Sequence, residues 1–228
     1  KARDADCRLV VTDGVFSMRG TVANLPEIVR LAKKHDAKVM VDDAHGSGVL
    51  GKTGRGTLEH FGVEGQVDIV CGTFSKAFAS AGGFTGARAE VVSFLRLCSR
   101  PFIFTASPPP SVAATVLACL EVIRDEPELL TRLHQNSDFV KTGLSAAGFR
   151  LEPTITPIIP VLIGDDVKTF MLAGGLEEEG VVVNPIVPPA VPKEKSLIRI
   201  SLMATLTQDQ LGQAVEKFSK VGRRLGII

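Results

Sequence analysis

Thr73-Phe74-Ser75-Lys76 follows the apolar run Val67-Asp68-Ile69-Val70-Cys71-Gly72 and precedes Ala81-Gly82-Gly83-Phe84. The apolar run predicts a buried strand, and Lys76 comes just past its end among small residues. We expect a lysine in this position to be partly desolvated, which favours the neutral amine and lets it form a Schiff base with a carbonyl. Taken alone, a lysine after a strand is more often a solvated loop residue.

A second signal lies upstream, in Val39-Met40-Val41-Asp42-Asp43-Ala44-His45-Gly46. Here an apolar run ends in a carboxylate, Asp42, and an imidazole, His45, three residues apart. An acidic pair at a strand end is, by itself, often a helix cap or a turn. Together with Lys76 these side chains offer an amine for an aldehyde, a carboxylate for a pyridinium nitrogen and a group beside the ring. The combination predicts a pyridoxal phosphate site.

The composition excludes several classes of protein. The chain has 228 residues, 45% of them hydrophobic and 22% charged, which is typical of one large or two small globular domains. A formal net charge of +1 gives no reason to expect a nucleic-acid partner or an anionic membrane surface. No apolar run reaches transmembrane length, and no signal-peptide core is present. We therefore expect a cytoplasmic protein without a membrane span.

The cysteine pattern also favours a cytoplasmic protein. The four are widely spaced, none forms a Cys-x-x-Cys pair, and three lie in apolar runs. This pattern favours reduced thiols in a cytosolic protein over disulfides or a zinc site. We predict no metal.

The first half alternates apolar runs with helical patterns. Strands are expected at 9–12, 38–41, 67–71 and 84–87, with helices from Asn24 or Pro26 and over 90–97. All-apolar strands separated by helices predict a parallel sheet covered on both faces. Ligands bind such sheets at the edge formed by the strand carboxyl ends. We therefore expect Asp42, His45 and Lys76 to meet there.

The second half has a different character. After Pro108-Pro109-Pro110 the pattern predicts the following elements, in chain order: helices over 111–123 and 127–147, a strand over 158–163, a helix over 167–179, a strand over 181–183, a proline-rich loop over 185–192, a strand over 197–202 and a helix over 208–225. This order indicates a smaller α+β domain. We expect the C-terminal portion of a large, cofactor-binding domain over 1–112, an interdomain helix over 113–125 and the small C-terminal domain over 126–228.

These residues resemble the α-oxoamine synthase family, whose fold is the pyridoxal-phosphate-dependent transferase fold of the aspartate aminotransferase type. That fold is α/β, with a mostly parallel sheet in the large domain and a smaller α+β C-terminal domain. The resemblance covers essentially the whole chain. The matching segments are Thr12-Asp13-Gly14-Val15-Phe16-Ser17-Met18, Val41-Asp42-Asp43-Ala44-His45-Gly46, Gly54-Arg55-Gly56, Gly72-Thr73-Phe74-Ser75-Lys76, Ser99-Arg100-Pro101-Phe102-Ile103-Phe104-Thr105-Ala106-Ser107 and Leu197-Ile198-Arg199-Ile200-Ser201.

The resemblance implies cofactor roles for several positions. Lys76 would hold pyridoxal 5'-phosphate as a Schiff base, and Asp42 would pair with the pyridine nitrogen and keep it protonated. His45 would lie near the phenolic oxygen, and Ser17 would place a hydroxyl in the same pocket. Thr73 would contact the phosphate. Without the family, Ser17 could equally be a turn hydroxyl.

Two further positions concern a partner subunit and the substrate. Thr105 would reach the phosphate of the neighbouring subunit, which implies a homodimer with a shared active site. Without the family, Thr105 is more simply interpreted as a residue that precedes a helix. Arg199 would hold the amino-acid carboxylate through a bidentate contact. A charge between Ile198 and Ile200 on a strand also needs a partner on general grounds.

The implied reaction is condensation of an amino acid with an acyl-CoA to give a 2-amino-ketone or a 2-amino-3-keto acid. Residues 13–24 and the Asp42 segment resemble glycine C-acetyltransferase or 8-amino-7-oxononanoate synthase, and we favour glycine as the amino acid. The Lys76 segment and residues 100–111 instead resemble bacterial serine palmitoyltransferase. That enzyme has Arg where this chain has Val187, which weakens the alternative.

The family's N-terminal half supplies the glycine-rich turn that holds the phosphate and the ring that stacks on the pyridine. The chain begins at Lys1 without these segments, so we expect a fragment that alone binds the cofactor weakly or not at all. Two other classes remain open. One is a non-catalytic subunit that keeps the fold. The other is a different pyridoxal phosphate reaction, such as transamination or β-elimination.

Overall fold

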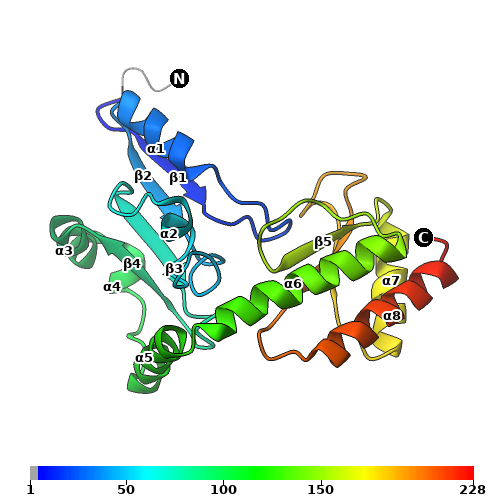
Figure 1. The fold of residues 1–228 in the computed structure, drawn as a ribbon. Helices are drawn as coiled ribbons and strands as arrows, with labels where there is room; N and C mark the ends of the chain where they lie inside the picture. The colour runs from blue at the N-terminus through cyan, green and yellow to red at the C-terminus, as the bar shows by residue number, and fades with distance from the viewer. Residues whose placement is uncertain (1–4) are drawn as a thin grey trace. The chain divides into compact units, whose positions relative to one another are not determined.

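In the computed structural model, which describes residues 5–228, the chain forms two units (Figure 1). The first contains residues up to Val15 together with Val22–Pro127, and the second contains Phe16–Thr21 and Glu128–Ile228. The excursion of Phe16–Thr21 into the second unit was not expected from the sequence. The role of 113–125 as an interdomain helix remains a prediction.

The first unit is built on a four-stranded sheet. Its strands are β1 (Leu9–Asp13), β2 (Lys38–Asp42), β3 (Ile69–Thr73) and β4 (Gly83–Ala87), in that spatial order. β1, β2 and β3 run parallel, whereas β4 is antiparallel to β3. The predicted parallel sheet is therefore present, with one antiparallel edge strand added.

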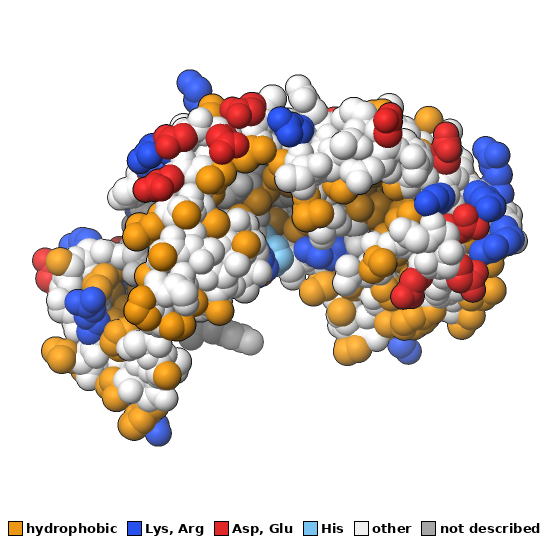
Figure 2. Space-filling view, turned by 90° about the horizontal axis from the view of Figure 1, so that it is seen from below, with side chains coloured by type: hydrophobic (Ala, Val, Ile, Leu, Met, Phe, Trp, Pro, Cys, Tyr) orange, Lys and Arg blue, Asp and Glu red, His pale blue; other side chains and the backbone are white. Residues whose placement is uncertain are grey.

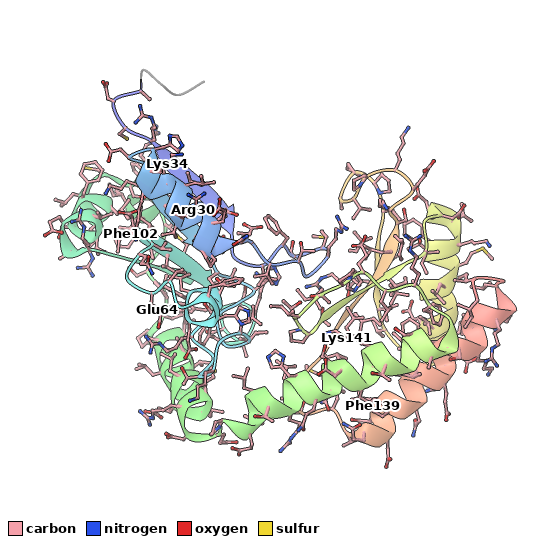
Figure 3. All side chains as sticks on the ribbon, turned by 45° about the horizontal axis from the view of Figure 1, so that its top comes forward. Arg30, Lys34, Glu64, Phe102, Phe139 and Lys141 are labelled. Atoms are coloured by element: carbon pink, nitrogen blue, oxygen red, sulfur yellow. The ribbon has the colours of Figure 1, made fainter. Side chains whose placement is uncertain are left out.

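The sequence of helix α1 (Leu25–Lys34) explains where the helix begins and which face it packs against the sheet. The Asn24 side chain accepts a hydrogen bond from the Glu27 backbone N–H at 3.3 Å, and a proline follows in the first turn. The inner face of the helix buries Leu25, Val29 and Ala32, and residues of this face pack with Val39 and Val41 of β2. Polar side chains such as Arg30 and Lys34 are exposed (Figure 3).

The remaining helices of the first unit are α2 (Thr57–Phe61), α3 (Ala89–Cys98), α4 (Arg100–Ile103) and α5 (Pro110–Asp125). The expectation that the sheet is covered on both faces is wrong for the described chain. Leu9 and Val11 of β1 share one face of the sheet and stay 49% and 61% exposed, and within residues 5–228 β1 pairs only with β2. Hydrophobic side chains also gather on the left of the molecule in Figure 2. In α3 and α5, Phe94, Leu97 and Leu117 are exposed.

The second unit contains a three-stranded antiparallel sheet of order β5-β7-β6 and three helices. Its strands are β5 (Ile158–Leu162), β6 (Asn184–Ile186) and β7 (Leu197–Ser201), and its helices are α6 (Glu128–Ala147), α7 (Asp166–Glu178) and α8 (Gln208–Arg224). The shared core includes Leu144, Leu172, Ile198 and Phe218. On α6, Phe139 and Lys141 point to different sides (Figure 3), and Lys141 donates to the Thr154 carbonyl oxygen at 3.1 Å.

One predicted strand of this unit is misplaced. Residues 181–183 form no strand. Pairing with β7 begins at Asn184, directly before the segment predicted as a loop, and continues through Pro185 and Ile186 inside that segment. Val181 and Val183 are partly buried against the core, which explains their apolar pattern. β6 tolerates Pro185 because it is an edge strand, where a missing N–H removes no interior ladder bond.

Candidate active site

The carboxyl ends of β2 and β3 form one edge of the first unit's sheet. The two strands are parallel, with Asp42 opposite Cys71 in the register. Asp42 ends β2, and Thr73 ends β3. The loop that holds His45 and the loop that holds Lys76 therefore both begin at this edge, as the strand pattern predicted.

Asp42 is anchored through its backbone and one side-chain oxygen. Its carbonyl accepts from the Gly14 N–H at 2.7 Å, and its Oδ1 accepts from the Ala44 N–H at 3.0 Å. Within residues 5–228 its Oδ2 makes no hydrogen bond. The half-buried carboxylate thus keeps one oxygen for an external donor such as a protonated ring nitrogen.

The neighbouring Asp43 is a residue that sequence reasoning missed. It is 1% exposed, and both its oxygens accept hydrogen bonds from Thr57. Burial, the largest effect, raises the pKa of Asp43 to about 6, the charge of Asp42 acts in the same direction, and the bonds from Thr57 oppose both. The acidic pair in the sequence could have indicated this buried carboxylate. Side chains of adjacent residues at a strand end point to opposite sides, so one of the two must point into the protein.

The loop after β3 holds Lys76 by backbone bonds. The Phe74 N–H donates to the Gly82 carbonyl, the Ser80 N–H to the Phe74 carbonyl and the Ala79 N–H to the Lys76 carbonyl. The expectation that Lys76 is partly desolvated is wrong for the described chain. The side chain is exposed.

The hydroxyl of Thr73 belongs to a small polar cluster beside Lys76. Its Oγ1 donates to the Gly82 carbonyl at 3.1 Å, accepts from the Ser75 N–H at 3.2 Å and lies 2.7 Å from the Ser75 Oγ. Two hydroxyls therefore face each other next to the lysine. Ser75 is a second missed residue, and its place in the quoted motif between Thr73 and Lys76 was the available signal.

Ser17 and Arg199 meet within the second unit. The Nε of Arg199 donates to the Ser17 carbonyl oxygen at 2.6 Å, and its Nη1 donates to the Ser201 Oγ at 2.8 Å. No carboxylate of residues 5–228 pairs with this guanidinium. Burial lowers the pKa of Arg199, as expected for a charge partly removed from water. The structure thus leaves an oriented guanidinium that lacks an anionic partner in the described chain.

Thr105 follows α4 in an exposed stretch. It makes no hydrogen bond to any residue of the described chain, and therefore none to the loop that holds Lys76. Its neighbours Ile103 and Phe104 are 50% and 80% exposed. The predicted role of Thr105 needs a second subunit, so it stays a prediction.

Residues 5–228 hold neither a metal-binding cluster nor a membrane-spanning helix. No cluster of three or more His, Cys, Asp or Glu in this part of the chain could hold a metal ion. No described helix combines the length and the apolar character needed to cross a bilayer.

Comparison with known proteins identifies the family and the relatives that this chain resembles. The model of the family described as aminotransferase class I and II matches residues 1–218. A serine palmitoyltransferase of Bacteroides ovatus is 45% identical over 100% of this chain and 58% of its own length. An 8-amino-7-oxononanoate synthase of Exiguobacterium sibiricum is 46% identical with the same coverage. A solved serine palmitoyltransferase with a pyridoxal phosphate internal aldimine superposes with a TM-score of 0.94 at 41% identity, covering 98% of this chain and 57% of that one.

These matches confirm the predicted fold class and the resemblance to α-oxoamine synthases. The chain spans somewhat more than half the length of the relatives it matches.

Proposed function

Because the chain belongs to the aminotransferase class I and II family, we propose that its protein uses pyridoxal phosphate to condense an amino acid with an acyl-CoA. The observation that carries this proposal is the common sheet edge from which the Asp42 and Lys76 loops both begin. Its relatives named serine palmitoyltransferase and 8-amino-7-oxononanoate synthase support the acyl-transfer class over transamination. They also favour an enzyme over a non-catalytic subunit.

The residues at this edge fit the cofactor. Lys76 offers an exposed amine for the aldehyde, and Asp42 offers a free Oδ2 for the ring nitrogen. The hydroxyls of Thr73 and Ser75 lie beside the lysine, where they suit a phosphate group. When bound, pyridoxal phosphate supplies an electron sink that stabilises negative charge at the substrate Cα.

The chain's own residues would supply proton transfer and orientation. Lys76 Nζ would take the proton from the substrate Cα. The negative charge of Asp42 would keep the ring nitrogen protonated and so maintain the electron sink. His45, in the turn after β2, would act beside the ring.

Arg199 would bind the carboxylate of the amino acid. Its Nε and Nη1 are held by Ser17 and Ser201, which fixes the plane of the guanidinium. A planar, fixed guanidinium with no anionic partner in residues 5–228 matches the geometry of a carboxylate.

We propose glycine as the amino acid, following the residues around Asp42. Serine with a long-chain acyl-CoA is the second candidate, because the relatives and the superposed structure include serine palmitoyltransferases. We also propose a cytoplasmic homodimer with a shared site. The free state of all four cysteines and the exposed apolar residues beside Thr105 support these two points.

The test is release of CoA by the full-length protein. Glycine and serine are each supplied with short-chain and long-chain acyl-CoA, and free thiol is measured with and without pyridoxal phosphate. We expect cofactor-dependent release, loss of it in Lys76→Ala, and no loss in the control Lys52→Ala, which alters another exposed loop lysine. Cofactor-dependent amino-group exchange without CoA release would instead establish a transaminase.

A further inference from the structure

Asp43 is a buried carboxylate that the proposed reaction does not use. Its Oδ1 accepts from the Thr57 hydroxyl at 2.7 Å, and its Oδ2 accepts from the Thr57 N–H at 2.8 Å. Thr57 is itself fully buried. One threonine thus satisfies both oxygens of the carboxylate, and the pair links the end of β2 to the start of α2.

Three glycines enclose this carboxylate. A Cβ added to Gly14, Gly46 or Gly56 would lie 2.5, 2.1 or 1.9 Å from an Asp43 oxygen. These glycines come from three different segments: the end of β1, the turn after β2 and the residue before α2. The absence of side chains at these positions lets all three segments close around one carboxylate.

The backbone of Asp43 builds the turn that contains His45. Its N–H donates to the Cys71 carbonyl of β3 at 2.8 Å. Its carbonyl accepts from the Gly46 and Ser47 N–H groups at 3.1 and 2.9 Å, which closes the turn. A displacement of Asp43 would therefore move His45 on one side and Asp42 on the other.

We propose that Asp43 is a positioning residue, whose bonds to Thr57 fix Asp42 and His45 at the cofactor edge. This inference rests on the proposed function for the identity of the cofactor. Asp43 is buried and both its oxygens are bonded to Thr57, so it acts only through its neighbours. Because a hydrogen-bonded carboxylate in a tight cradle has one allowed position, the bond to Thr57 sets the direction of the Asp42 carboxylate.

The experiment uses the full-length protein and four variants. Asp43→Ala removes the carboxylate, and Thr57→Val removes only the hydroxyl bond. Asp43→Asn keeps the shape, since its Oδ1 accepts from the Thr57 N–H and its Nδ2 donates to the Thr57 Oγ1. The control Thr169→Val deletes another fully buried hydroxyl, which donates to the Asp165 carbonyl in the second unit.

Three readouts are recorded for each protein. They are the Kd of pyridoxal phosphate, the pH midpoint of the visible absorbance band of the bound cofactor, and amide hydrogen exchange over residues 42–47 without cofactor. We expect Asp43→Ala and Thr57→Val to raise the Kd by roughly tenfold, to shift the band midpoint and to speed exchange. Asp43→Asn should retain most of the affinity, and Thr169→Val should change none of the three readouts.

The outcomes separate the two proposals. Unchanged affinity, band and exchange in Thr57→Val would overturn the positioning role, even if Asp43→Ala failed to fold. Equal changes in Thr169→Val, at the same loss of melting temperature, would also overturn it by showing a general destabilisation. If the wild type bound no pyridoxal phosphate, the proposed function would fail, and hydrogen exchange over residues 42–47 would still test the positioning of the turn.

Discussion

The Nε of Arg199 donates to the carbonyl oxygen of Ser17 across 2.6 Å, joining positions that are 182 residues apart. The two residues come from separate motifs that the sequence assigned to one site. The contact uses the Ser17 backbone, so it fixes the guanidinium without occupying the serine hydroxyl. With Nη1 held by Ser201, the guanidinium plane is set before a substrate arrives. Such preorganisation lowers the cost of binding a carboxylate.

Replacing Arg199 by lysine should therefore weaken binding of the amino acid. A lysine has a point charge and no planar fork, so it cannot keep the Ser17 contact and bind a carboxylate bidentately. We expect the KM for the amino acid to rise by about tenfold or more, the equivalent of at least one charge-assisted hydrogen bond. Steady-state kinetics at saturating acyl-CoA measures this. Arg150→Lys, at an exposed arginine of the same unit, is the control and should leave KM unchanged.

Ser17→Ala should have little effect on the position of Arg199. The acceptor in this contact is the backbone carbonyl, which alanine also provides. We expect the KM for the amino acid to change by less than about threefold, because no bond to Arg199 is lost. A KM increase as large as that of Arg199→Lys would mean that the Ser17 hydroxyl itself contacts the substrate. The Kd of pyridoxal phosphate, measured in parallel, reports a separate role of the hydroxyl toward the cofactor.

Gly20 holds the Ser17 segment in place, and substitution there should be costly. Its φ is +64°, and an added Cβ would lie 2.6 Å from the Thr156 Oγ1 and 2.9 Å from the Ile158 carbonyl oxygen. Its own carbonyl accepts from the Thr154 and Thr156 hydroxyls. We expect Gly20→Ala to lower the free energy of unfolding by about 2–3 kcal/mol, through strain at positive φ and overpacking.

The control for this variant lies on a helix. A Cβ at Gly212 of α8 would meet no atom within 4 Å, and its φ is not in the left-handed region. Gly212→Ala should therefore raise the free energy of unfolding by about 1 kcal/mol through helix propensity. Urea unfolding followed by circular dichroism measures both variants. A stabilising Gly20→Ala would show that the Ser17 segment does not adopt the described conformation.

Local signals in the sequence predicted much of this structure. The cap at Asn24 and the proline after it marked the start of α1, and the apolar runs located β2 and β3. The parallel arrangement then followed, and with it the common edge at which β2 and β3 end. These features depend on residues close together in the chain, where periodicity and capping are informative.

Contacts between distant residues could not be predicted in the same way. The pairing of Asp43 with Thr57 depends on how the turn after β2 meets α2, which no local pattern encodes. The inclusion of Phe16–Thr21 in the second unit also depends on contacts between distant residues. Lys76 was expected to be partly desolvated because its neighbours in the sequence are small, yet its side chain is exposed in the described chain. Val181 and Val183 were assigned to a strand because of their apolar pattern. That pattern also arises in a segment without strand pairing whose side chains pack against a core, as these two do.

The final prediction concerns the pH dependence of stability. Burial is the main cause that raises the pKa of Asp43 in the folded protein to about 6, from an ordinary value of 3.8. The native state therefore holds this proton more tightly than the unfolded chain does. Its contribution to stability is fully present below about pH 4 and is lost as the pH rises through about 6. The difference in pKa corresponds to about 3 kcal/mol at most.

Asp43→Asn isolates this contribution, because asparagine resembles the protonated acid and does not titrate. We expect wild type and variant to have similar free energies of unfolding near about pH 4, and the variant to gain up to about 3 kcal/mol relative to wild type by about pH 7. Urea unfolding of both proteins at several pH values in this range gives the difference, in which other titrating groups cancel. A difference that stays constant with pH would mean that Thr57 stabilises the ionised carboxylate as well as water does.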